Sequence, residues 1–174
     1  MSVTLILGGA RSGKSRRAEA LALSLSEQPV YIATAPMIEG DSEWLARIEH
    51  HRHQRSDAWQ LVEEELALTV TLEKYATHGQ TVLVDCLTLW LSNLIYADKN
   101  ITDETDALCA ALPGLSGHVI LVANEVGMGL VPETSQGRAF RDAQGCLNQA
   151  VAAVADRVEF IAAGLPMLLK GEML

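Results

Sequence analysis

The feature that most constrains the fold is a glycine-rich turn between an apolar segment and a helical one. Residues 8–15 read Gly-Gly-Ala-Arg-Ser-Gly-Lys-Ser and match the pattern G-x-x-x-x-G-K-[ST]. The apolar residues 3–7 are typical of a buried strand, and the three- and four-residue spacing over 14–26 predicts a helix. Because strand, turn and helix follow in this order, we expect a loop that binds a nucleoside triphosphate.

The residue types in this loop suit a phosphate chain. Glycines let backbone N–H groups approach phosphate oxygens closely. The Lys14 ammonium can reach the β- and γ-phosphates, the Ser15 hydroxyl can bind Mg²⁺, and the helix that follows adds its positive dipole end. The candidate nucleotide contacts are therefore Gly8, Gly9, Ala10, Arg11, Ser12, Gly13, Lys14 and Ser15.

Length and composition favour a single domain. The chain has 174 residues, of which 49% are hydrophobic, which is enough for one core over residues 1–174. No apolar run reaches about 18 residues, so we expect no membrane span, and the N-terminus leaves no room for a signal peptide. Three widely spaced cysteines, Cys86, Cys109 and Cys146, predict buried thiols in a reducing compartment. We therefore expect a cytoplasmic protein.

Charge is distributed unevenly along the chain. The formal net charge of −9 argues against general nucleic-acid binding. Residues 1–55 nevertheless hold seven of the 13 Lys and Arg residues and only six of the 22 Asp and Glu residues. Positive charge thus gathers around the phosphate loop and around Arg47, Arg52 and Arg55, which predicts one site for an anionic ligand.

Strand and helix patterns alternate along the chain without internal repeats. Further strands are expected at 29–34, 81–85, 118–123 and 156–162, with a short extended run at 58–62. Further helices are expected at 42–54, 66–76, 87–96, after a cap at Thr102 or Asp103, and at 135–155, before a tail that begins at Gly164. These elements predict an α/β fold of the P-loop NTPase type, with a mostly parallel sheet and helices on both faces.

Two strands end in residues that suit a nucleotide site, because ligands bind at the carboxyl ends of parallel strands. The strand at 29–34 leads into the small residues Ala33, Thr34 and Ala35, which either leave room for a nucleotide or form a plain turn. The strand at 81–85 ends in Asp85. We expect this strand to lie next to the P-loop strand, so that Asp85 can join Ser15 in binding Mg²⁺.

The expected helix at 42–54 carries two adjacent histidines in different settings. His51 falls on the apolar stripe of this helix, whereas His50 lies off the stripe on the side of Arg47. A neutral imidazole can attack a phosphate and form a phosphoramidate, and His50 has the access that a nucleophile needs. A zinc site made by His50, His51 and His53 is the competing interpretation, although their spacing lacks an i, i+4 pair.

An ordered set of motifs extends over nearly the whole chain. It comprises the phosphate loop at 8–15, Tyr-Ile-Ala-Thr at 31–34, Arg-Ile-Glu-His-His-Arg at 47–52, Trp59, Glu63, Asn-Glu-Val-Gly-Met-Gly-Leu-Val-Pro at 124–132 and Phe-Arg-Asp at 140–142. This set resembles the bifunctional adenosylcobinamide kinase / adenosylcobinamide-phosphate guanylyltransferase family of cobalamin biosynthesis.

The resemblance implies two reactions. In the first, ATP or GTP phosphorylates the primary hydroxyl of adenosylcobinamide. In the second, guanylate from GTP is carried on a histidine, which matches His50, and is passed to adenosylcobinamide phosphate to give adenosylcobinamide-GDP. The resemblance also implies Mg²⁺, a homotrimer, and nucleotide contacts outside the loop at Ala33, Thr34, Ala35, His51, Arg52, His53, Gln54, Glu63 and Asp85.

Some assignments stay open at this level. Asn124 and Glu125 meet either the corrinoid or a neighbouring subunit, and the polar side of the helix at 135–155, which includes Asn148, is either a solvated face or a subunit contact. Two other functions compete with the bifunctional enzyme. One is a P-loop kinase for a small molecule without a covalent intermediate, and the other is a nucleotide-dependent switch or assembly ATPase.

Overall fold

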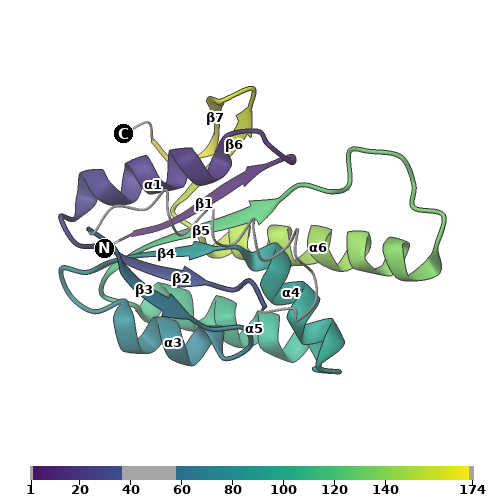
Figure 1. Ribbon diagram of the computed structural model, residues 1–174, viewed down its shortest axis with the longest axis horizontal. Coiled ribbons are helices and arrows are strands. Elements are labelled where there is room, and N and C mark those ends of the chain that lie inside the picture. Colours follow the sequence, from purple (N-terminus) through teal and green to yellow (C-terminus); the bar gives the residue numbers. More distant parts are fainter. Residues whose placement is uncertain (1, 37–57, 173–174) are drawn as a thin grey trace.

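The computed structural model describes residues 2–36 and 58–172, and within these ranges seven strands form one sheet. Their order across the sheet is β3-β2-β4-β5-β1-β6-β7, and every neighbouring pair is parallel except β6 and β7 (Figure 1). The strands are β1 (Ser2–Gly8), β2 (Val30–Ala33), β3 (Gln60–Glu63), β4 (Thr81–Asp85), β5 (His118–Asn124), β6 (Arg157–Ala162) and β7 (Leu165–Lys170).

Helices cover both faces of the sheet, as the sequence predicts, but unequally. Among the described residues, α1 (Lys14–Leu25) lies on one face, and the other four α-helices lie on the opposite face (Figure 1). Those four are α3 (Leu68–Tyr75), α4 (Leu87–Tyr96), α5 (Ile101–Ala111) and α6 (Ser135–Val154), and a 3₁₀ turn, η1 (Leu112–Gly114), follows α5. No helix in the described ranges is long and apolar enough to cross a membrane.

Alternation along the buried strands creates two separate cores. In β1, Leu5 packs in the core beneath α3–α6, whereas Ile6 packs in the smaller core under α1. Both side chains are fully buried. Successive side chains of a strand point to opposite faces, so continuous apolar strands such as β1 are what a sheet covered on both sides requires.

The strand order differs from the expected one at one position. We expected the strand that ends in Asp85 to lie next to the P-loop strand, but β5 lies between β4 and β1. β5 pairs with β1 through Gly8 and Asn124, and with β4 through Val122 and Asp85. The prediction was wrong because local sequence patterns identify strands but do not specify their order in a sheet. The inserted strand places Asn124 between the phosphate loop and Asp85.

The segment from Gly164 onward is also different from its prediction. It forms β7, which runs antiparallel to β6, and not a trailing tail. The two turn residues Ala163 and Gly164 have φ values of 51° and 80°, which suit a tight two-residue hairpin. β7 is an edge strand with Leu165, Met167 and Leu169 exposed, so it lacks the buried face on which the earlier strands were recognised.

Several smaller boundaries also move. α5 is capped by Asn100, whose side chain accepts hydrogen bonds from the N–H groups of Thr102 and Asp103, so neither of those residues is the cap. α3 begins two residues later than expected, at Leu68, because the Glu64 carboxylate holds the preceding N–H groups in a turn. Cys86 is buried, but Cys109 is half-buried and Cys146 is exposed, so only one of the three free thiols matches the prediction. The expected helix at 42–54 lies outside the described residues.

A buried ion cluster ties α1 to the C-terminal hairpin. The Glu159 carboxylate on β6 is fully buried and accepts two hydrogen bonds of 2.9 Å from the Arg17 guanidinium of α1. Arg157, also buried, donates to the same carboxylate and to the carbonyl oxygen of Glu172. The hydrogen bonds from Arg17 are the main cause that lowers the pKa of Glu159 below its ordinary value, and those from Arg157 add to this effect.

Replacing the Glu159 carboxylate should make the free energy of unfolding less dependent on pH in the acid range. Because the pKa of Glu159 is lowered by folding, its ionised form stabilises the fold above the unfolded-state pKa of about 4.5, and this contribution is lost as pH falls through the folded-state value. Glu159→Gln should lower the free energy of unfolding at pH 7 by about 3 kcal/mol. Urea denaturation between pH 7 and pH 3 should show the gap to wild type narrowing below about pH 4.5. A gap that stays constant with pH would contradict this account.

Candidate functional site

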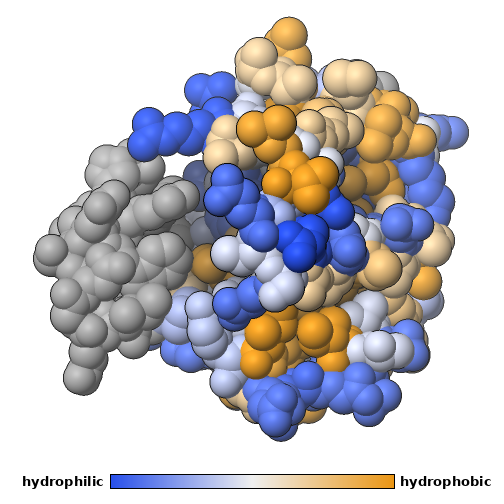
Figure 2. Space-filling view, turned by 90° about the vertical axis from the view of Figure 1, so that its right-hand side faces the viewer, coloured by the Kyte–Doolittle hydropathy of each residue, from blue (hydrophilic) through white to orange (hydrophobic). Residues whose placement is uncertain are grey.

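Six parallel strands end at one edge of the sheet, and β1 to β5 bring candidate residues there. The register places Gly8 beside Asn124, Ala33 beside Asp85, and Glu63 beside Ala33. Figure 2 faces this edge and shows hydrophilic side chains at its centre, with apolar groups above and below them. The structure therefore places the phosphate loop at the same edge as the candidate nucleotide contacts at the ends of β2, β3 and β4.

The phosphate loop wraps closely around its own backbone. Gly13 adopts a left-handed conformation with φ 97° just before α1, and the Lys14 ammonium donates a 3.1 Å hydrogen bond to the carbonyl oxygen of Gly9. No described side chain caps the N-terminus of α1. Its first N–H groups therefore remain available to an anion, and the helix dipole favours negative charge at this point.

The β6–β7 turn packs directly against this loop. The Gly164 N–H donates a 2.8 Å hydrogen bond to the carbonyl oxygen of Ser12. A Cβ atom on Gly13 would lie 3.2 Å from the Gly164 Cα, and one on Gly8 would lie 2.7 Å from the carbonyl oxygen of Ile161. The β6–β7 hairpin, which was not predicted from the sequence, thus supports the phosphate loop from outside.

Asp85 is half-buried at the end of β4, and its side chain has a defined partner. The buried Tyr31 hydroxyl donates a 2.9 Å hydrogen bond to Oδ2 of Asp85. The rings of Tyr31 and Trp59 meet edge to face, with centroids 5.5 Å apart and planes at 84°. This edge-to-face arrangement is a favoured aromatic geometry and fixes the ring.

Thr34, just after β2, forms hydrogen bonds with the backbone at the end of β4. It is fully buried, and its hydroxyl donates to the carbonyl oxygen of Cys86 and accepts from the Cys86 N–H, at 2.7 and 2.8 Å. Asn93 of α4 then donates to the carbonyl oxygens of both Thr34 and Glu65. Burial, with the Asp85 carboxylate nearby, raises the pKa of the Cys86 thiol to about 11, so it stays protonated at neutral pH. Thr34 therefore fixes the backbone beside Asp85.

Asn124 belongs to a polar cluster that sequence reasoning did not resolve. Its N–H donates to the Thr88 hydroxyl, and its carbonyl oxygen accepts from Asn148 of α6, which in turn accepts from Gln144. Asn148 is half-buried and Gln144 is buried, so this part of α6 packs against the end of β5 and is not a solvated face. The side-chain oxygens of Asn124 and Gln144 are buried without a hydrogen-bond partner in the described structure. The sequence signal that could have pointed to this cluster is the polar residue Asn124 at the end of the buried strand β5.

The remaining candidates divide into described and undescribed residues. Ala35 is half-buried just beyond β2, and Glu63 is exposed at the end of β3. Glu125 folds back to accept the N–H groups of Gly127 and Met128, so it organises the loop between β5 and α6. That loop projects beyond the carboxyl edge (Figure 1). The other candidates lie outside the described residues; they are His50, His51, Arg52, His53 and Gln54.

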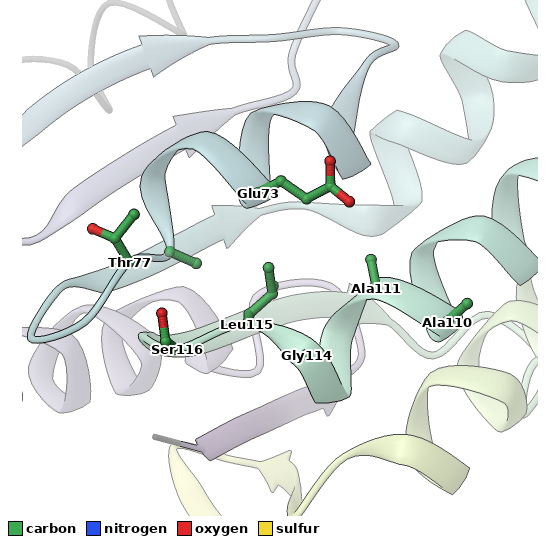
Figure 3. A pocket seen from close by; sticks show the side chains of 8 residues that line it. Glu73, Thr77, Ala110, Ala111, Gly114, Leu115 and Ser116 are labelled. Carbon is green, nitrogen blue, oxygen red and sulfur yellow. The ribbon is translucent and has the colours of Figure 1, made fainter.

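A surface hollow of about 380 Å³ lies elsewhere on the molecule. It is formed between the end of α3 and the segment around η1, with Glu73, Thr77 and Ser116 on its rim (Figure 3). Thr77 and Ser116 precede β4 and β5, which places the hollow near the amino ends of the strands. None of the described candidate residues lines it, so it is not the predicted site.

The sequence comparisons agree on one family. Residues 4–169 match the family described as cobinamide kinase / cobinamide phosphate guanyltransferase. The chain belongs to this family. It is 50% identical to the bifunctional adenosylcobalamin biosynthesis protein CobP of Pseudomonas aeruginosa over 98% of both chains. It is 40% identical to the protein CobU of Escherichia coli K12, over 95% of this chain and 98% of that one. The resemblance found in the sequence motifs is therefore confirmed.

Solved structures agree with the fold alone. A Pyrococcus horikoshii protein, PH0250, superimposes with a TM-score of 0.56 at 9% identity and covers 99% of this chain and 87% of its own. The flagellar accessory protein FlaH of Methanocaldococcus jannaschii superimposes with a TM-score of 0.53 at 15% identity, over 99% and 79% of the two chains. These similarities confirm the predicted α/β fold, with a mostly parallel sheet and helices on both faces.

The close approach of loop and hairpin predicts a sharp difference between two glycines. A Cβ on Gly8 would lie 2.5 Å from Ser12 Oγ and 2.7 Å from a backbone oxygen, whereas a Cβ on Gly9 meets nothing within 4 Å. Gly8→Ala should therefore lower the free energy of unfolding by about 1–3 kcal/mol because of overpacking. Gly9→Ala should stay within about 0.5 kcal/mol of wild type.

Urea denaturation of the nucleotide-free protein measures both values. Because the two glycines are adjacent, the Gly9 variant controls for loss of glycine flexibility in the loop. Equal stability of the two variants would show that the hairpin does not confine the loop.

Proposed function

We propose that this protein carries out both reactions of its family. It phosphorylates adenosylcobinamide with ATP or GTP, and it then transfers guanylate from GTP through a histidine to form adenosylcobinamide-GDP. The observation that carries the proposal is the family match over residues 4–169, together with 50% identity to a relative named as bifunctional over 98% of both chains. The arrangement of the phosphate loop and Asp85 at one edge supports it.

In the kinase step, the residues of the loop hold the triphosphate. The Lys14 ammonium exchanges the Gly9 carbonyl for phosphate oxygens, and the N–H groups at the start of α1 bind the phosphate chain. The primary hydroxyl oxygen of the substrate attacks the γ-phosphorus, the bond to the β-phosphate oxygen breaks, and the hydroxyl proton is released. The buried side-chain oxygen of Asn124 lies at the strand end between the loop and Asp85, where the γ-phosphoryl group is transferred.

The side chains at this edge also fit Mg²⁺. The Asp85 carboxylate and the Ser15 hydroxyl are hard oxygen donors, and Mg²⁺ is commonly held by one or two carboxylates with water and phosphate oxygens. Asp85 Oδ2 accepts a hydrogen bond from the Tyr31 hydroxyl. Oδ1 is therefore the oxygen of Asp85 that would bind the ion, together with the Ser15 hydroxyl. When bound, the ion neutralises charge on the phosphate oxygens.

In the transfer step, His50 is the nucleophile. Its neutral imidazole nitrogen attacks the α-phosphorus of GTP, the bond to the β-phosphate oxygen breaks, and pyrophosphate leaves. A phosphate oxygen of adenosylcobinamide phosphate then attacks the same phosphorus, which breaks the N–P bond and regenerates the histidine. We assign Arg52 to the phosphate oxygens during this step.

Further nucleotide contacts and the assembly complete the proposal. The nucleotide contacts outside the loop are Ala33, Thr34, Ala35, His51, Arg52, His53, Gln54, Glu63 and Asp85. Of these, Thr34 is buried with its hydroxyl bonded to Cys86 and its backbone bonded to Asp85 and Asn93, so it contributes by fixing the strand end. The protein acts as a homotrimer, which sedimentation equilibrium measures. It works in the cytoplasm, where ATP and GTP are supplied.

Covalent labelling tests the transfer step directly. Incubation with [α-³²P]GTP should attach one guanylate per chain through an acid-labile, base-stable bond, because a phosphoramidate has this stability. His50→Ala should lose the label by at least about 100-fold while it retains phosphorylation of adenosylcobinamide, since the nucleophile is absent but the phosphate loop is intact.

Two controls make the result specific. His78→Ala removes an exposed histidine at the opposite edge of the sheet and should label as wild type does. Lys14→Ala should lose both reactions because it removes the charge at the phosphates. A protein that phosphorylates adenosylcobinamide but never acquires the label would be a kinase without a covalent intermediate.

A further inference from the structure

The hydrogen bond between Tyr31 and Asp85 links two neighbouring strands, and the proposed function assigns no role to Tyr31. The Tyr31 side chain is only 2% exposed, and its hydroxyl donates to Oδ2 of Asp85 at 2.9 Å. A buried hydroxyl needs a partner, but a carboxylate at the edge of a sheet could be hydrated instead. The contact therefore satisfies the buried Tyr31 hydroxyl and also restricts the rotation of the Asp85 carboxylate.

The sheet register explains how the two side chains meet. Ala33 is opposite Asp85 in the parallel pairing of β2 and β4, and Tyr31 is two residues earlier on the same face of β2. The pair is thus diagonal, at a distance that long aromatic side chains can span. Tyr31 packs in the core under α1, and the edge contact with Trp59 supports its ring. The hydroxyl consequently stands at a fixed point beside the carboxylate.

We infer that Tyr31 is a positioning residue that fixes the rotation of the Asp85 carboxylate and so sets the affinity of the site for the Mg²⁺–nucleotide complex. This inference rests on the proposed function, in which Asp85 is a metal ligand. The Tyr31 hydroxyl occupies Oδ2, so Oδ1 is the carboxylate oxygen assigned to the metal.

Among the described contacts, those of Thr34 and Tyr31 act on different parts of the strand end at Asp85. The Thr34 hydroxyl bonds both backbone groups of Cys86 and fixes the main chain after Asp85. The Tyr31 hydroxyl bonds the carboxylate itself. Removing a hydrogen-bond partner of a metal ligand typically weakens metal affinity by about 10–100-fold, because the ligand then loses its orientation. Tyr31→Phe removes the hydroxyl that makes this bond and keeps the ring in the core.

The test measures nucleotide binding as a function of Mg²⁺ and needs no turnover. A fluorescent GTP analogue with a methylene bridge between the α- and β-phosphates is held at a concentration below saturation while free Mg²⁺ is increased. The bridge prevents transfer of guanylate to the protein, so only binding is measured. Tyr31→Phe should raise the Mg²⁺ concentration for half-maximal binding by about 10-fold. Binding in EDTA should change by less than twofold. Tyr96→Phe, which removes a hydroxyl from a side chain that is 81% exposed, is the matched control and should behave as wild type.

A double-mutant cycle separates this inference from the function on which it rests. Asp85→Asn should also raise the Mg²⁺ requirement, and adding Tyr31→Phe to it should cause little further change, because the two residues act through one ligand. If Asp85→Asn shifts the Mg²⁺ dependence but Tyr31→Phe does not, the positioning role is wrong and the metal site stands. If neither variant shifts it, both assignments are wrong.

Two further outcomes complete the test. Equal loss of binding with Mg²⁺ and with EDTA in Tyr31→Phe would indicate damage to the pocket and overturn the inference. If thermal denaturation shows that Tyr31→Phe is unfolded, 3-fluorotyrosine at position 31 replaces it, since fluorine changes the donor strength of the hydroxyl with little change in shape. A shifted Mg²⁺ dependence then supports the inference, and an unchanged one overturns it.

Discussion

The absence of a side chain at Gly8 is the constraint on which the rest of the site depends. At this residue β1 must turn into the phosphate loop while Ser12 and the carbonyl oxygen of Ile161 press against the same point. The hydrogen bond from Gly164 to Ser12 and the contact of Gly164 with Gly13 then hold the far side of the loop. Since the loop is enclosed in this way, its N–H groups and Lys14 are ordered by packing before any anion arrives.

The second requirement is that the neighbouring strand ends hold their own shape. Asp85 is fixed through its carboxylate by Tyr31, and through the adjoining main chain by Thr34 and Asn93. Asn124 is held by Thr88 and by α6. These partners come from β2, from the residue that follows it, and from α4 and α6, so the geometry of the edge follows from the packing of the strands and helices around it. Such support from rigid elements is what a site for charged ligands needs.

Sequence reasoning was reliable where local chemistry and local structure coincide. The loop at 8–15 needs a strand before it and a helix after it, and the apolar patterns on either side supplied both. The strand that ends in Asp85 was found for the same reason. Membership of the family followed from several motifs in a fixed order, which no single pattern could have established.

The features that were missed depend on contacts between segments distant in sequence. The position of β5 between β1 and β4 is a property of the sheet, and β7 is an exposed edge strand whose apolar residues face solvent. Thr34 looked like a small residue that makes room for a ligand, but its hydroxyl is committed to Cys86. Asn100 was overlooked as a cap because Thr102 and Asp103, two good capping types, follow it directly.

The late position of the supporting hairpin has a consequence for how the protein matures during synthesis. The phosphate loop leaves the ribosome well before its partner Gly164, which is translated about 150 residues later. A nascent chain can form α1 early, but β1 lacks both of its neighbouring strands until β5 and β6 are made. The loop cannot close against the hairpin until that turn has emerged. The protein therefore encloses its phosphate loop only after the β6–β7 hairpin has been synthesised.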